Sequence, residues 1–199
     1  MPHDPAHADA LASQFTHVRI LLGMVVGLGL THLIRHFARI IDRPVRERTY
    51  WVHLLWAVSM FVYLLHFWWW EFRLAHLTQW TFVLYLYVAL YALLLYLLCA
   101  IIFPDSMEGY ADYEDYFYSR RKWFFGLLAL AYVVDLGDTG LKGRSYFEGF
   151  GPELALRSLI YVVLCLVAIA TPDRRFHAAF VVAGLLYQLS WIVRQFETL

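Results

Sequence analysis

The stretch from Tyr50 to Trp70, YWVHLLWAVSMFVYLLHFWWW, constrains the fold more than any other part of the chain. It carries no formally charged side chain, and it closes on three consecutive tryptophans. A helix needs about 20 apolar residues to cross roughly 30 Å of hydrocarbon. Arginines precede this stretch, and cationic and aromatic side chains are what a membrane interface selects. The sequence therefore predicts a membrane-spanning helix here.

The rest of the chain follows the same pattern. Hydrophobic residues make up 61% of the sequence and aromatic residues 19%, with a mean hydropathy of +0.55. These values exceed those of an ordinary globular domain, so much of the surface must face lipid. We predict an all-α fold, a polytopic bundle of six transmembrane helices arranged as three hairpins, in a single transmembrane domain over residues 1–199. The predicted spans are 18–41, 50–70, 80–103, 122–137, 154–171 and 176–193.

Charge and motifs exclude several classes of protein. The sixteen cationic and sixteen acidic side chains balance, whereas a nucleic-acid-binding surface needs a basic excess. Cys99 and Cys165 lie inside apolar runs and are expected to be small buried hydrophobes. The sequence shows no Ser-His-Asp, HExxH or usual zinc-ligand pattern, which favours a non-enzymatic protein without catalytic residues or a metal site.

Arginine and lysine are distributed unequally between the two sides. Ten lie near the connections that follow the first, third and fifth spans, at positions 35, 39, 43, 46, 48, 120, 121, 122, 174 and 175. Six lie on the other side, at positions 19, 73, 142, 144, 157 and 194. Cytoplasmic connections carry the cationic excess, so we expect both termini to be periplasmic.

Ionisable residues gather on the predicted outer side. Such groups are costly at membrane depth, so they usually point inward and pair. One interpretation is a structural salt bridge between Asp135 and Arg157. The other is an ion or proton path that begins at Asp135 and Asp138. The full candidate set is Asp135, Asp138, Arg157, Glu153, Glu71 and His66.

Histidines near the predicted inner side raise a second possibility. His32 lies just before the arginines that end the first span, and His53 follows the start of the second, so an antiparallel hairpin places both at similar depth. Two imidazoles from neighbouring helices can hold a haem iron, and Arg35 and Arg39 would then meet the propionates. The alternative is that these histidines only hydrogen-bond at the interface.

Small residues recur every fourth position on the first span, at Gly23, Gly27 and Thr31. This spacing lets a second helix approach to backbone contact. The partner is expected to be another helix of the same chain, or a second copy in a homo-oligomer or larger membrane complex.

Several segments together resemble a group of small bacterial six-helix integral membrane proteins. They read THLIRHFAR, YWVHLLW, HFWWWEF, WTF, FPD and RRKWFF, and they cover about two thirds of the chain. The resemblance implies a bacterial inner membrane location and carries over no activity.

Polar groups at both ends of one bundle favour a channel-like or transporter-like protein for a small ion or solute, or a subunit of such an assembly. The first alternative is a haem b electron carrier. The second is a non-catalytic membrane sensor or assembly subunit, whose contact surface is the arginine-rich connection and the acidic, tyrosine-rich one over 104–122. No cofactor is expected in the leading hypothesis.

Overall fold

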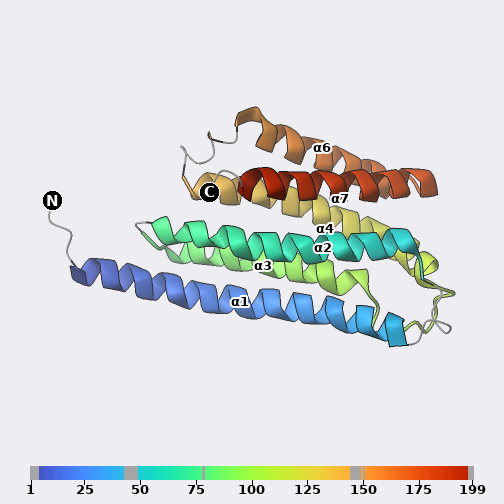
Figure 1. Cartoon of the computed structure of the whole chain (residues 1–199), viewed down its shortest axis with the longest axis horizontal. Helices are drawn as coiled ribbons and strands as arrows, with labels where there is room; N and C mark the ends of the chain where they lie inside the picture. Colours follow the sequence, from blue (N-terminus) through green and yellow to red (C-terminus); the bar gives the residue numbers. More distant parts are fainter. Residues whose placement is uncertain (1–4, 43–48, 78, 144–148, 150, 197–199) are drawn as a thin grey trace.

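The computed structural model describes residues 5–42, 49–77, 79–143, 149 and 151–196, and within these ranges it is all-α (Figure 1). Six helices are long and apolar enough to cross a membrane, so the predicted fold class is confirmed. The chain is a polytopic membrane protein by helix length and hydropathy. The helices are α1 Pro5–Asp42, α2 Trp51–Trp70, α3 Phe82–Ile102, α4 Tyr113–Leu141, α6 Gly151–Ala170 and α7 Arg174–Phe196, with the short 3-10 helix η1 Glu71–His76 after α2.

Successive helices run antiparallel, and both termini lie at the same end of the bundle (Figure 1). We call this the Glu71 end and the opposite one the Tyr50 end. Packing does not simply follow chain order. The most extensive contacts join α4 to α6, α1 to α3 and α3 to α4, followed by α2 to α7. Helices that are distant in the sequence, such as α2 and α7, therefore lie in contact. Helices α2 and α4 both carry many buried residues.

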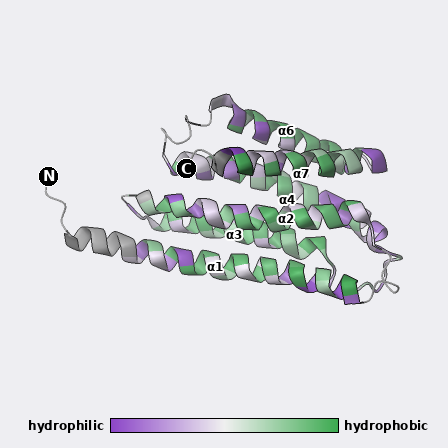
Figure 2. Cartoon of the chain, viewed as in Figure 1, coloured by the Kyte–Doolittle hydropathy of each residue, from purple (hydrophilic) through white to green (hydrophobic). Residues whose placement is uncertain are grey.

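Apolar side chains cover the outside of the bundle as well as its core. Leu28 on α1, Leu90 on α3 and Leu159 on α6 are all exposed, as expected of a surface that faces lipid. Figure 2 shows hydrophobic residues along the middle of the helices and hydrophilic ones gathering toward their ends. Inside, Tyr91 and Phe125 are fully buried.

Helix α4 extends at both ends beyond its predicted span, which begins at Lys122 and ends at Gly137. It starts at Tyr113, where the Asp112 side chain accepts a hydrogen bond from the Asp115 backbone N–H, 2.9 Å away. Its 29 residues give a length of about 43 Å, more than the hydrocarbon thickness. The charged SRRK segment is therefore part of a helix longer than the hydrocarbon is thick, where the sequence alone indicates a loop.

Polar side chains close several helix ends at the Tyr50 end. Helix α3 stops before Pro104, which cannot continue a helix, and its last carbonyls need donors. Tyr116 donates to the Ile101 carbonyl over 2.7 Å, and His53 donates to the Ile102 carbonyl. After α6, His177 Nε2 lies 2.9 Å from the Thr171 carbonyl oxygen. Buried histidines thus satisfy backbone groups that lipid cannot.

The small residues of α1 do not form one common contact. A methyl group added at Gly23 would lie 3.0 Å from the Trp68 ring of α2, so this position packs within the chain. A methyl group at Gly27 would have nothing within 4 Å among the described residues, and Thr31 is exposed. The stripe therefore serves α1–α2 packing at Gly23, while a contact between copies is not shown.

Candidate functional site

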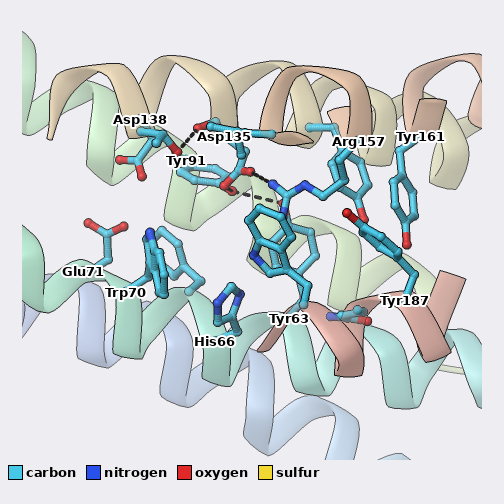
Figure 3. Close-up of a pocket in the computed structure, with 16 residues that line it drawn as sticks. Tyr63, His66, Trp70, Glu71, Tyr91, Asp135, Asp138, Arg157, Tyr161 and Tyr187 are labelled. Carbon is cyan, nitrogen blue, oxygen red and sulfur yellow. Dashed lines mark hydrogen bonds and ion pairs between the residues drawn. The ribbon is translucent and has the colours of Figure 1, made fainter. Parts of the chain in front are cut away.

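Polar side chains from several helices surround a cavity near the Glu71 end (Figure 3). Its volume is about 40 Å³, enough for water or a small ion but far below that of an organic ligand site. We call it the polar chamber. It includes Glu71, Tyr63, Tyr91, Asp135, Asp138 and Arg157 in its lining.

Asp135 of α4 and Arg157 of α6 form an ion pair in the wall of the chamber. Their side chains are mostly buried, at 19% and 11% exposure. Arg157 donates to Asp135 Oδ2, and the Tyr91 hydroxyl donates to Oδ1 over 3.0 Å. The guanidinium also lies 4.6 Å from the centre of the Trp191 ring. Both oxygens of Asp135 are therefore engaged, which is the salt bridge that one sequence interpretation expected.

A hydrogen-bonded row leads from this pair toward the middle of the bundle. The hydroxyl oxygens of Tyr91 and Tyr63 lie 3.1 Å apart. Further along α2, Ser59 donates to the Gln188 side-chain oxygen of α7 over 2.8 Å. Ser59 precedes Glu71 by twelve positions, or about 18 Å along a helix. Polar groups therefore occupy much of the half of the bundle nearer the Glu71 end.

A second charged cluster joins η1 to the end of α4. Lys142 Nζ donates to Glu71 Oε1 over 2.8 Å and also donates to Asp138 Oδ2. The three side chains are only 1–2% exposed. Burial alone would lower the pKa of the Lys142 ammonium, but the carboxylates of Asp138 and Glu71 raise it above its ordinary value. The two carboxylates therefore favour the charged form of Lys142.

In this cluster, Glu71 and Asp138 each bind Lys142 through one carboxylate oxygen. Within the described part of the chain, Glu71 Oε2 and Asp138 Oδ1 are buried and have no hydrogen-bond partner. Figure 3 shows the two carboxylates facing each other across the chamber, Glu71 from η1 and Asp138 from α4. Unsatisfied buried acceptors are rare because desolvation is costly, so these two oxygens require an explanation.

The remaining members of the predicted outer set lie in different positions. His66 lines the polar chamber, with its ring 5.1 Å from that of Trp70. Glu153 instead pairs with Arg194 at 2.7 Å, and both side chains are more than 40% exposed. The chamber lining thus contains five of the six predicted residues.

The predicted haem ligands do not face a common space. His53 is buried, its Nε2 is bound to the Ile102 carbonyl, and its ring stacks on Tyr113 at 5.3 Å. The Phe103 ring contacts both His53, at 4.9 Å, and His36, at 4.8 Å. His32 instead contacts His36 on its own helix at 4.3 Å.

The predicted propionate partners give no further support to this site. Arg39 donates to the Pro104 carbonyl over 3.3 Å, and Arg35 is exposed. These contacts explain the inner histidines and arginines as packing and helix-end groups, so we do not propose the haem site.

Sequence reasoning missed the role of Lys142, which it treated only as a loop cation. The available signal was spacing, because Lys142 follows Asp138 by four residues and shares its helical face. The contact of Tyr91 with Asp135 had no such signal, since it depends on how α3 packs against α4. Arginines 43, 46 and 48 and Arg144 lie outside the described residues.

Comparisons with known proteins leave the chain without an assigned family. No protein-family model, curated protein or solved structure matches it.

Proposed function

We propose that the protein moves a small cation or a proton across the membrane, as a channel-like or transporter-like protein or as a subunit of one. The observation that carries this proposal is a charge imbalance in the polar chamber. Among the described residues, the charged side chains that line the chamber or form an ion pair with a carboxylate of its lining are the carboxylates Glu71, Asp135 and Asp138 and the cations Arg157 and Lys142. One negative charge is left without a counter-charge.

An uncompensated charge at membrane depth costs a few kcal/mol or more, so a bound cation or proton would stabilise the chamber. The chamber volume of about 40 Å³ limits the ligand to this size class. The hydrogen-bonded row from Asp135 through Tyr91 and Tyr63 offers a route toward the middle of the bundle. Size, charge and route therefore favour the same class of cargo.

We further propose that the protein lies in a bacterial inner membrane with the Glu71 end outward. The cationic excess at the Tyr50 end supports this orientation through the positive-inside rule. In this orientation the chamber belongs to the outer half of the bundle.

Flux measurements in reconstituted vesicles test the function. Purified protein is placed in liposomes, and entry of protons, Na⁺ and K⁺ is followed with dyes under an imposed gradient. We expect flux of at least one of these ions above that of protein-free vesicles. Asp135→Asn is expected to lower it about tenfold, the effect of roughly 1.4 kcal/mol on the barrier.

Glu108→Gln is the matched control, because Glu108 is an exposed carboxylate in the connection before α4, at the Tyr50 end. It should retain the wild-type flux. Size-exclusion chromatography confirms that each variant is folded. Wild-type flux equal to that of empty vesicles for all three ions would overturn the proposal, as would unchanged flux in a folded Asp135→Asn variant.

A further inference from the structure

The two charged clusters of the polar chamber differ in one respect that bears on where a cation binds. Asp135 uses both carboxylate oxygens, one with Arg157 and one with Tyr91. Glu71 and Asp138 each use one oxygen, with the same ammonium group of Lys142. The excess negative charge therefore belongs to Glu71 and Asp138, which share one cation between two carboxylates.

The free oxygens of this pair are deeply buried, and both residues line the chamber. Glu71 and Asp138 are both 1% exposed, and Figure 3 shows their carboxylates directed toward each other. A hard metal cation usually takes about six oxygen ligands. Among the described residues this pair offers two unpartnered carboxylate oxygens, far fewer than such an ion needs. A proton needs only one of them and removes the excess charge completely.

We propose that Glu71 and Asp138 share one proton beside the fixed cation Lys142, and that this proton is the ion that the polar chamber takes up. Its part in transport rests on the proposed function, whereas its location is tested separately. The reaction is a simple association. One carboxylate oxygen takes a proton from hydronium, which becomes water, and the cluster changes from a net charge of −1 to neutral.

Charged and titratable groups on every element around the pair set this balance. His66 of α2 lines the same chamber, and Tyr187 of α7 does so on the far side. Two further cations lie over aromatic rings. The guanidinium of Arg19 of α1 is 4.4 Å from the centre of the Phe72 ring, and that of Arg73 of η1 is 5.6 Å from the centre of the Trp70 ring. The other groups facing the pair are Tyr87 and Tyr91 of α3, Asp135 of α4 and Arg157 of α6. Lys142 bonds to both carboxylates of the pair.

Infrared spectroscopy of the reconstituted protein tests the shared proton, because a protonated carboxyl group has a C=O stretch separate from those of carboxylates and amides. The wild type at neutral pH should show one such band per chain, and the band should shift in D₂O. Glu71→Gln and Asp138→Asn should each abolish it, since either change leaves one carboxylate matched by Lys142. Glu108→Gln should leave it unchanged.

Lys142→Met gives the opposite expectation. Without the cation both carboxyl groups take a proton, and the band area should rise about twofold. Absence of the band in the wild type, its survival in Glu71→Gln, or its loss in Glu108→Gln would overturn the inference.

Native protein with carbon-13 in its glutamate or aspartate carboxyl groups removes any dependence on how variants fold. A shared proton predicts that each label shifts part of the band, since the pair titrates as a unit. A band that shifts wholly with one label contradicts sharing. A band without ion flux overturns the proposed function alone, and flux without the band overturns this inference alone.

Discussion

Arg157 contacts three kinds of partner within the bundle. Its guanidinium pairs with the Asp135 carboxylate, lies 4.6 Å from the Trp191 ring centre and lies 5.9 Å from that of Tyr132. Aromatic faces attract cations most where water is excluded. This single side chain therefore connects α6 to α4 and α7, and it neutralises a carboxylate that lipid would otherwise penalise.

Replacing Arg157 should therefore destabilise the fold strongly. Arg157→Met leaves Asp135 buried without a cation, which costs about 3–5 kcal/mol when a buried pair is broken. The double variant Asp135→Asn/Arg157→Met should recover most of this loss, since no unpaired charge remains. Unfolding with SDS in mixed micelles measures the two free energies. A double variant no more stable than Arg157→Met would show that the ion pair is not the cause.

At the scale of the helices, the sequence predicts that each helix exists more reliably than it predicts where the helix begins and ends. Apolar runs of about 20 residues predict six spans, and the described part of the chain contains six helices of that kind. The start of α4 was placed too late because Arg120, Arg121 and Lys122 were interpreted as a connection. Charge excludes a segment from lipid but not from a helix, and Asp112 supplies the cap that begins it.

Two glycines of α4 provide a matched test of packing at this scale. A methyl group at Gly137 would overlap the Tyr87 hydroxyl, which donates to the Val134 carbonyl over 2.6 Å. Gly137→Ala should destabilise the protein by about 1–3 kcal/mol, as overpacking does. A methyl group at Gly126 meets no described atom within 4 Å, so Gly126→Ala should gain up to about 1 kcal/mol in helix propensity.

The same unfolding assay compares both alanine variants. Adding Tyr87→Phe to Gly137→Ala should restore part of the stability, because it removes the overlapping oxygen. Equal effects of the two alanine substitutions would contradict the packing argument.

At the scale of the whole molecule, sequence predicted which side chains are costly but not which ones meet. Asp135, Asp138 and Glu71 were recognised because carboxylates near lipid need partners. Their division into a balanced pair with Arg157 and an unbalanced cluster with Lys142 depends on how α4 packs against α6 and on where η1 turns. Which carboxylate pairs with which cation is set by tertiary packing, and the hydropathy or residue spacing within one segment carries little information about it.

Orientation is a property of the whole molecule that single cysteines can test. The native Cys99 and Cys165 are both buried, so labelling should report on added cysteines. Gln79 at the Glu71 end and Glu108 at the Tyr50 end are both exposed. In intact cells, a membrane-impermeant maleimide should label Gln79→Cys and should label Glu108→Cys only after permeabilisation. The reverse pattern would place the chamber in the cytoplasmic half.

The unequal distribution of polar groups along the bundle affects how it would respond to voltage. From Glu71 to Ser59 the interior carries hydrogen-bonding groups, whereas Trp56, Phe125 and Phe180 fill the adjacent layer toward the Tyr50 end. A transmembrane potential falls mainly across the layer with the lowest dielectric constant, because the electric field is strongest there. A charge that crosses the full potential gains about 2.3 kcal/mol per 100 mV. Most of that gain arises in the aromatic layer. Protonation at Glu71 should therefore depend on the pH on the Glu71 side of the membrane, whereas the rate at which an ion crosses the aromatic layer should depend on the voltage.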